Sequence, residues 1–246
     1  MQEEAGKKIS EEFGLLDEAS AVKEYSALNS VFMYPNYPLI ADEVLSRLNF
    51  TQGRILDIGT GLGTLALEFA KRLPQAEIIG VDISQEMLQE AQKNACARQL
   101  GHVKFIPCDA HKFCFRDLSF DLAVSFGVLH HLNDLKAVFS GIKTLLKPGA
   151  VAYIYDLRKD AGQDIVSEIT RGMSPLQARA FLESVKESFD EPHLENVLKD
   201  AGFSAYSFSC PKYSRRTLMK NKEMLRNSRF TGERFNRILW ECFLKK

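Results

Sequence analysis

The stretch Leu56-Asp57-Ile58-Gly59-Thr60-Gly61-Leu62-Gly63 decides the fold of this chain. It lies between a run of β-forming residues at 54–58 and an apolar pattern with helical spacing at 62–73. Glycines at such a strand-to-helix turn let a ligand approach the backbone closely, and the first turn of the helix has N–H groups without helical partners. The stretch therefore predicts a ligand site at the end of a strand.

The glycine spacing differs from the dinucleotide-binding fingerprint G-x-G-x-x-G/A. Counted from Gly59, the third glycine of that fingerprint would fall on Thr64. The residues follow D-x-G-x-G-x-G instead, with Asp57 at the end of the strand. A carboxylate there repels a pyrophosphate and attracts a ligand that carries an amino group or a positive charge. Asp57 therefore favours a cationic ligand.

Strand-like runs alternate with helical patterns from residue 54 to residue 157. The predicted strands cover 54–58, 76–83, 103–108, 120–128 and 150–157. Their apolar runs are continuous, which is typical of strands covered on both faces. Between them, Ser84 precedes a helix over 85–100, and Asn133 or Asp134 precedes a helix that runs to Lys147. The alternation predicts an α/β fold with a doubly wound parallel sheet.

Two further acids stand at the ends of the next two predicted strands. Asp82 follows Asp57 by 25 residues, and Asp109 follows Asp82 by 27. Open α/β sheets bind ligands at the carboxyl ends of their strands, so the three carboxylates are expected around one site. The place of Asp82 suits hydrogen bonds to ribose hydroxyls. A lone acid after a strand is commonly a helix cap, but three in succession favour a ligand site.

These motifs resemble those of class I S-adenosylmethionine-dependent methyltransferases, over residues 50–157 and more weakly to residue 210. The resemblance implies a mostly parallel seven-stranded sheet with helices on both faces, the Rossmann-like methyltransferase fold. It also implies S-adenosylmethionine as the cofactor and S-adenosylhomocysteine as its product. The cofactor-binding residues that it implies are Asp57, Gly59, Thr60 and Gly61 for the methionine part, Asp82 for the ribose, Ile83 and Met87 for contacts around the adenine, and Asp109 with Ala110 at the adenine amino group.

The segment 123–131 is similar to the one that faces the sulfonium in the ubiquinone/menaquinone-biosynthesis-type subgroup. The resemblance makes Ser125 and Phe126 neighbours of the cofactor. His130 and His131 follow directly and are candidates for a catalytic general base, needed only where the acceptor loses a proton. The alternative is that one histidine caps the next helix and the other packs in the interior.

Three tyrosines, Tyr25, Tyr34 and Tyr37, stand in an N-terminal segment that in this family often folds over the cofactor and the acceptor. The analogy places them on the substrate side, and packing against a helix is the alternative. No metal is expected, because the cysteine and histidine positions around Asp109 do not have the spacing of a zinc site.

Four segments are expected within one domain. They are a helical N-terminal cap at 1–50, the cofactor-binding core at 51–157, a helical lid insertion at 158–192, and the end of the sheet with a basic C-terminal extension at 193–246. The lid has an amphipathic pattern at 163–189, followed by a short helix at 192–201. Beyond these, strands are expected over 203–210 and near 213–219, and a helix over 222–246.

The expected function is methyl transfer to a small organic acceptor by in-line displacement. Methylation of amino groups on nucleic-acid bases is disfavoured, because Ser125-Phe126-Gly127-Val128 stands where those enzymes carry an Asn/Asp-Pro-Pro-aromatic motif. The alternatives are a methyltransferase that acts on RNA or protein, and a domain that binds the cofactor without catalysis. The intact turn and the three acids count against a degenerate site.

Composition places few limits on the partners. The 246 residues carry no net charge, but residues 1–20 hold a net charge of −4 and residues 212–246 a net charge of +8. The basic segment could meet an anionic acceptor, RNA, or acidic residues of its own or a partner chain, so nucleic acid stays open and a homodimer is a further expectation. Five scattered cysteines and the absence of a secretory or membrane-spanning segment predict a cytoplasmic enzyme.

Overall fold

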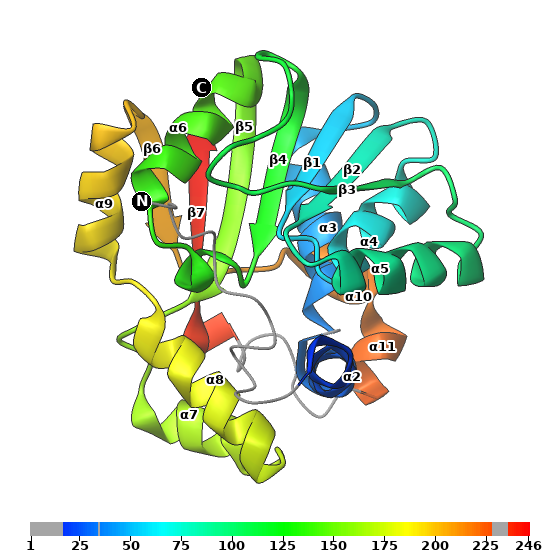
Figure 1. The fold of residues 1–246 in the computed structure, drawn as a ribbon, viewed down its shortest axis with the longest axis vertical. Helices are drawn as coiled ribbons and strands as arrows, with labels where there is room; N and C mark the ends of the chain where they lie inside the picture. The colour runs from blue at the N-terminus through cyan, green and yellow to red at the C-terminus, as the bar shows by residue number, and fades with distance from the viewer. Residues whose placement is uncertain (1–16, 34, 228–235) are drawn as a thin grey trace.

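A computed structural model describes residues 17–33, 35–227 and 236–246. Its centre is a seven-stranded sheet in the order β3-β2-β1-β4-β5-β7-β6, seen face-on in Figure 1. The strands are β1 (Arg54–Ile58), β2 (Glu77–Asp82), β3 (Lys104–Pro107), β4 (Phe120–Phe126), β5 (Leu146–Leu157), β6 (Ala205–Ser209) and β7 (Leu239–Lys245). The first five are parallel, and β7 runs antiparallel to both of its neighbours. The α/β fold class and the mostly parallel sheet are confirmed.

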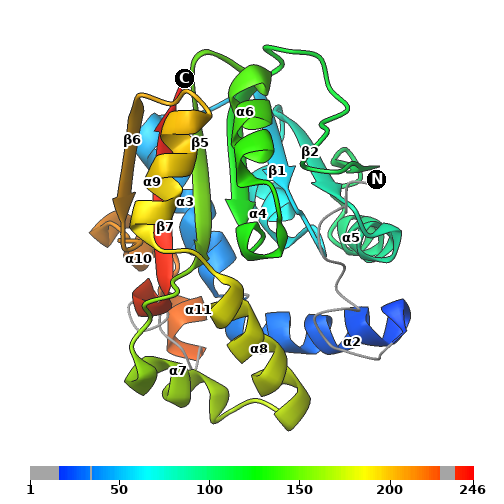
Figure 2. The ribbon, with the colours of Figure 1, turned by 60° about the vertical axis from the view of Figure 1, so that its left-hand side comes forward.

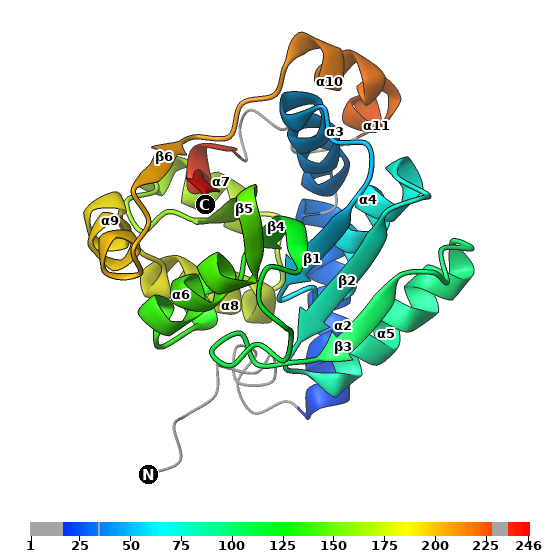
Figure 3. The same ribbon diagram turned by 90° about the horizontal axis from the view of Figure 1, so that it is seen from above.

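Helices cover both faces of the sheet, because alternate residues of the central strands belong to two different clusters of buried side chains. Ile55 of β1 packs in one cluster with α3 (Asn36–Leu48) and α4 (Thr64–Arg72). Leu56 packs in the other cluster with α6 (Leu135–Leu145) and α9 (Glu191–Asp200). Figure 3, seen from above, shows these two layers. Burial on both faces explains why the strands read as continuous apolar runs.

Several helix starts follow the local sequence as predicted. The Ser84 hydroxyl accepts a hydrogen bond from the N–H of Met87 at 3.2 Å and caps α5 (Gln85–Ala97). Asp134, rather than Asn133, caps α6 through the N–H of Ala137 at 2.9 Å. Each cap satisfies an N–H group that the first helical turn leaves without a partner. The helix α6 ends at Leu145, two residues before the predicted Lys147, because β5 already begins at Leu146.

Three helices gather at the carboxyl ends of the parallel strands. These are α2 (Glu18–Leu28), α7 (Gln163–Thr170) and α8 (Pro175–Glu187), which lie together below the sheet in Figures 1 and 2. The prediction of helices at 163–189 is confirmed. The α2 and α8 helices contact each other, and the side-chain amide of Gln177 lies 3.4 Å from the carboxylate of Glu24. The N-terminal segment continues from α2 through a short π-helix (Asn29–Met33) into α3.

The C-terminal part of the chain differs from the prediction in two places. The segment near 213–219 was predicted to be a strand, but Arg215–Lys220 forms the helix α10, which begins at the side-chain cap of Ser214 on Thr217. Of the helix predicted over 222–246, Lys222–Asn227 forms α11, residues 228–235 lie outside the described residues, and the prediction is wrong at Leu239–Lys245, which forms β7. β7 lies between β5 and β6, and both of its faces are covered. Its sequence therefore lacks the alternation of apolar and polar residues that identifies a strand with one exposed face.

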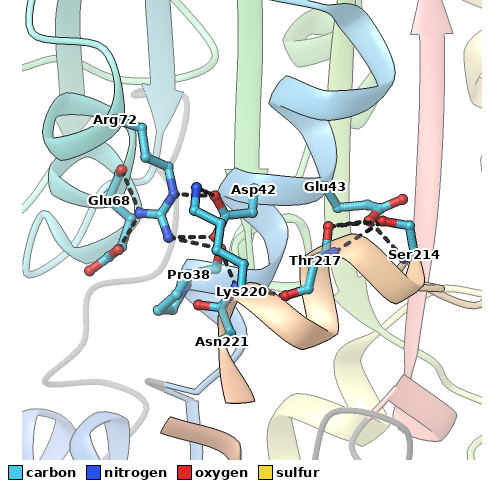
Figure 4. Close-up of polar contacts among 9 residues, drawn as sticks. All are labelled: Pro38, Asp42, Glu43, Glu68, Arg72, Ser214, Thr217, Lys220 and Asn221. Carbon is cyan, nitrogen blue, oxygen red and sulfur yellow. Dashed lines mark hydrogen bonds and ion pairs between the residues drawn. The ribbon is translucent and has the colours of Figure 1, made fainter. Parts of the chain in front are cut away.

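Charged side chains fasten α10 to the N-terminal part of the chain (Figure 4). Asp42 of α3 accepts two hydrogen bonds of 2.8 Å from the guanidinium of Arg72 and also pairs with Lys220. The neighbouring Glu43 accepts hydrogen bonds from the N–H of Ser214 at 2.8 Å and the hydroxyl of Thr217 at 2.7 Å. Part of the basic extension therefore meets acids of its own chain.

Candidate functional site

The Gly-rich turn joins β1 to α4 and is held by hydrogen bonds on both sides. Its N–H groups donate to β2, from Thr60 to the carbonyl of Val81 at 2.8 Å and from Gly61 to the carboxylate of Asp82 at 2.8 Å. Within the turn, the Asp57 carboxylate accepts from the Thr60 hydroxyl at 2.7 Å and from the N–H of Ala66 at 3.1 Å. The two acids that end β1 and β2 thus shape the turn that they flank.

Gly59 is required where it stands for two reasons. Its φ is +64°, a backbone conformation that favours glycine, and a Cβ at this position would lie 2.3 Å from a methyl group of Val128. Val128 belongs to the segment that follows β4, so the absence of a side chain at Gly59 lets this segment pack against the turn after β1. At Gly59 the glycine is therefore needed for its backbone conformation and for the packing of the Val128 side chain, in addition to the close ligand approach that the sequence predicts.

A pocket of about 770 Å³, including its open mouth, lies at the carboxyl ends of β1, β2, β3 and β4. Of the predicted cofactor residues, seven line it: Gly59, Gly61, Asp82, Ile83, Met87, Asp109 and Ala110. Further lining residues were not predicted: Val81, Ser84, Cys108, Gly127, Val128 and Leu132. Several of these directly precede or follow predicted residues at strand ends. Their place next to a strand end could have identified them, whereas the spacing of the motifs did not.

A second hollow of about 270 Å³ shares Tyr25 and Gly59 with the pocket and is lined by three more of the predicted cofactor residues. Its lining includes Asp57, Thr60, Phe126 and Tyr37. The Tyr37 hydroxyl accepts a hydrogen bond of 2.8 Å from the side chain of Asn29, a residue that the sequence did not single out. Asp57 therefore lies beside the main pocket, in a smaller, buried space.

Ser125 and the three predicted substrate-side tyrosines differ in where they lie relative to the two cavities. Ser125 is buried, donates its hydroxyl to the carbonyl of Ile58 at 3.0 Å, and lines neither cavity. Tyr25 of α2 lines both cavities, and its ring is the nearest group to the place that a Cβ on Gly61 would take, at 3.9 Å. Tyr34 lies outside the described residues. Tyr37 lines only the smaller hollow.

The three acids differ in their electrostatics. Burial raises the pKa of Asp57 to about 7, although hydrogen bonds from Thr60 and Ala66 lower it. Burial also raises the pKa of Asp82, against the N–H groups of Ser84 and Gly61. At Asp109 burial acts in the same direction, but the backbone and ring of His111 outweigh it and lower the pKa. Asp57 and Asp82 are therefore the acids that a cationic ligand would stabilise most in their charged form.

The two histidines occupy different places. His131 lines the pocket, whereas His130 is buried behind it with Nδ1 at 2.6 Å from the carboxylate of Asp156. Their rings are 4.0 Å apart between centroids. Within the described part of the chain, no three histidine, cysteine or acidic side chains come together as metal ligands. Asp109 instead pairs with His111 Nδ1 at 2.7 Å.

A family model described as "Methyltransferase domain" matches residues 50–232. The chain belongs to this methyltransferase family. A relative in the family, the demethylmenaquinone methyltransferase of Geobacillus kaustophilus, is 32% identical over 130 residues, which are 52% of this chain and 55% of the relative. The chain spans between 37% and 55% of the length of the first curated relatives that it matches.

Solved structures of methyltransferases share the fold. A Methanococcus maripaludis protein, described as a candidate S-adenosyl-L-methionine-dependent methyltransferase, is 26% identical with a TM-score of 0.68, over 85% of this chain and 92% of that one. The plantazolicin methyltransferase BpumL, solved with S-adenosylhomocysteine, has a TM-score of 0.75 at 19% identity, over 97% of this chain and 93% of its own. The seven-stranded sheet of this family member is thus the Rossmann-like methyltransferase fold.

Proposed function

We propose that this chain transfers the methyl group of S-adenosylmethionine to a small organic acceptor by in-line displacement. The observation that carries the proposal is the arrangement of Asp57, Asp82 and Asp109 around a Gly-rich turn and one pair of adjoining cavities. Among the described residues, neither cavity is lined by a lysine or an arginine. A site with carboxylates and no cations suits a ligand that is itself positively charged.

The residues present fit that cofactor. Asp57 is 2% exposed, and the groups that donate hydrogen bonds to it, the Thr60 hydroxyl and the Ala66 N–H, carry no positive charge, so a ligand ammonium group beside it would compensate a buried acid. We assign the methionine part to the turn with Asp57, Gly59, Thr60 and Gly61, next to Phe126. Asp82 would receive the ribose hydroxyls, with Ile83, Met87, Asp109 and Ala110 around the adenine, as the lining of the larger pocket supports.

The chain's own contribution is mainly positioning. Bound S-adenosylmethionine supplies a methyl group that its sulfonium already activates. Residues that hold donor and acceptor in line can lower the barrier by roughly 7–11 kcal/mol. His131 is the residue at the pocket wall that could take a proton from an acceptor hydroxyl or amine. Ser125 would support the site without lining it, because its hydroxyl holds the ends of β4 and β1 together.

A small acceptor is supported by the helices around the pocket. Tyr25 of α2 lines the cavity, and α8 contacts both α2 and the short helix Leu129–His131. We propose that residues 158–192 act as a lid and residues 1–50 as a cap over the core at 51–157. The names of relatives, which include a demethylmenaquinone methyltransferase and O-methyltransferases, agree with an organic acceptor.

The other partner predictions stay open. The pairing of Lys220 with Asp42 uses part of the basic extension within the chain, which weakens the case for nucleic acid. A homodimer and a cytoplasmic location remain predictions from the sequence. Among the described residues, no helix is both long and apolar enough to cross a bilayer.

Isothermal titration tests the cofactor assignment. We expect S-adenosylmethionine and S-adenosylhomocysteine to bind, and NAD⁺ to fail because its pyrophosphate would face Asp57 and Asp82. Absence of heat with both sulfur ligands would remove the proposal. A methyl-transfer screen against a metabolite pool then identifies the acceptor, with RNA and protein fractions as the competing outcomes.

A further inference from the structure

The carboxylate of Asp156, at the carboxyl end of β5, collects four N–H groups. Oδ2 accepts from the backbone of Val128 at 3.1 Å and of Leu129 at 2.6 Å. Oδ1 lies 2.7 Å from the N–H of Leu157 and 2.6 Å from His130 Nδ1. Asp156 is 1% exposed and lines neither cavity. It therefore reaches the pocket only through the segment that it binds.

The contact with Asp156 defines the state of His130. A carboxylate that already receives three backbone N–H groups acts as an acceptor, so the proton of this contact belongs to Nδ1 of the imidazole. A partner of this kind fixes both the tautomer and the orientation of a histidine ring. Since both side chains are buried, the geometry has little freedom to relax.

His131 packs against this pair and lines the pocket. Its ring packs on that of His130 at 4.0 Å, tilted by 50°, and its N–H donates to the carbonyl of Val128 at 3.0 Å. Asp156 thus binds both groups that contact His131 here: the backbone of Val128, whose carbonyl accepts from the His131 N–H, and the ring of His130, on which the His131 ring packs. His131 and Val128 line the pocket, whereas His130 does not.

We propose that Asp156 and His130 form a positioning pair that fixes the imidazole of His131 at the pocket wall. Neither residue is a catalytic residue, since neither reaches the cavity. The pair acts through His131, so its loss loosens that ring while every ligand-contacting group stays in the chain. The effect on methyl transfer rests on the function proposed above, but the fixed position of the ring is independent of it.

Histidine side-chain NMR tests the pair without an acceptor. The chain has five histidines, and the Cε1–H signals of ¹³C-labelled protein can be assigned with single variants. We expect the His131 signal to be sharp in the wild type, to broaden or split in Asp156→Asn and His130→Ala, and to recover in His130→Asn, whose amide can still donate to Asp156. Titration with S-adenosylhomocysteine should change the chemical shift of this signal in the wild type and in His130→Asn. The change should be at most half as large in Asp156→Asn and in His130→Ala.

Asp121→Asn is the matched control. Its carboxylate also accepts a backbone N–H, that of Arg54 at 2.8 Å, and binds Lys147, but at the opposite end of β4. It should lower stability without changing the His131 signal. If Asp156→Asn does not fold, the comparison of His130→Ala with His130→Asn decides alone.

Two failures can be told apart. A single His131 signal in ligand-free His130→Ala that is as sharp as in the wild type overturns the positioning pair, whatever binds. A wild-type protein that does not bind S-adenosylhomocysteine overturns the proposed function, while the ligand-free spectra still decide whether the pair orders His131.

Discussion

The backbone N–H of Gly61 donates to the carboxylate of Asp82 at 2.8 Å, which ties the turn after β1 to the end of β2. The other oxygen of the same carboxylate accepts from the N–H of Ser84 at 2.9 Å. Asp82 therefore shapes the Gly-rich turn before any ligand arrives. Asp82 also lines the pocket, where the ribose is proposed to lie.

Asp82→Asn should weaken S-adenosylhomocysteine binding at least about tenfold, because a charged hydrogen-bond acceptor is worth about 1.5–3 kcal/mol. The amide also places an N–H₂ group against one of two backbone donors. Titration calorimetry measures the loss. Asp117→Asn, a change at an exposed loop position, should bind as the wild type does. Equal affinities of Asp82→Asn and the wild type would remove Asp82 from the cofactor site.

Gly59→Ala should destabilise the protein more than Gly149→Ala. Both glycines have positive φ, +64° and +78°, but only at Gly59 does a Cβ meet a neighbour, the side chain of Val128. Backbone strain costs on the order of 1 kcal/mol in both variants, and overpacking adds about 1–3 kcal/mol at Gly59. Urea unfolding gives the difference. Similar losses in the two variants would contradict the close packing of this turn.

Asp57 should make stability fall as the pH rises. Its pKa is raised from 3.8 to about 7, so between these values the folded protein keeps a proton that the unfolded chain has released. Asp57→Asn cannot ionise. Its free energy of unfolding relative to the wild type should therefore improve by roughly 2–4 kcal/mol from pH 4 to pH 8. A constant difference across this range would refute the shifted pKa, since the lost hydrogen bonds affect both pH values equally.

Asp42→Asn should destabilise the protein by about 2 kcal/mol at pH 7, because it leaves Arg72 and Lys220 without their shared carboxylate. Burial opposes ionisation, but these cations lower the pKa of Asp42 to about 2. Its contribution is therefore complete above about pH 4 and is lost as the pH falls through 2. Unfolding at pH 7 and pH 2.5 should show the gap between variant and wild type shrinking, and Asp117→Asn should show no such trend.

His131→Ala should reduce turnover by about 10²–10⁴-fold if the acceptor loses a proton in the reaction. Affinity for S-adenosylhomocysteine should change little. Release of S-adenosylhomocysteine with the acceptor found by screening measures the rate. Unchanged turnover would exclude His131 as the base.

The half of the fold that positions the site was predictable because the residues at the ends of its strands and at the starts of its helices mark these boundaries in the sequence. Asp57 and Asp82 stand at the ends of the buried strands β1 and β2, Asp109 follows the edge strand β3 by two residues, and Ser84 and Asp134 mark helix starts by side-chain caps. Those signals are local, so a single sequence contains them. The pairing of Asp82 with the N–H of Gly61 is not local, since it depends on the register that brings Ile58 beside Val81.

The C-terminal half was harder to predict for physical reasons. Trp240 and Leu244 face one layer of helices, but Glu241 on the opposite face of β7 resembles a solvated helix position in the sequence. In the structure Glu241 is buried and paired with Arg47 at 2.6 Å, a partner nearly two hundred residues away. Asp156 is buried as well, and three of its four donors come from the segment after β4, 26 to 28 residues away. Burial of a charge by a distant partner has no pattern along the chain.

Because β7 is the last strand of the chain but lies inside the sheet, the sheet cannot be completed until the end of synthesis. Every residue that lines the main pocket precedes residue 133, so a growing chain contains the whole pocket wall long before residues 239–245 emerge. Until they do, β5 presents an open edge, and β6 has no neighbour in the sheet. An open strand edge is a site for pairing with other chains. Incomplete chains should therefore be the form of this protein most prone to aggregate, and the form on which chaperones act.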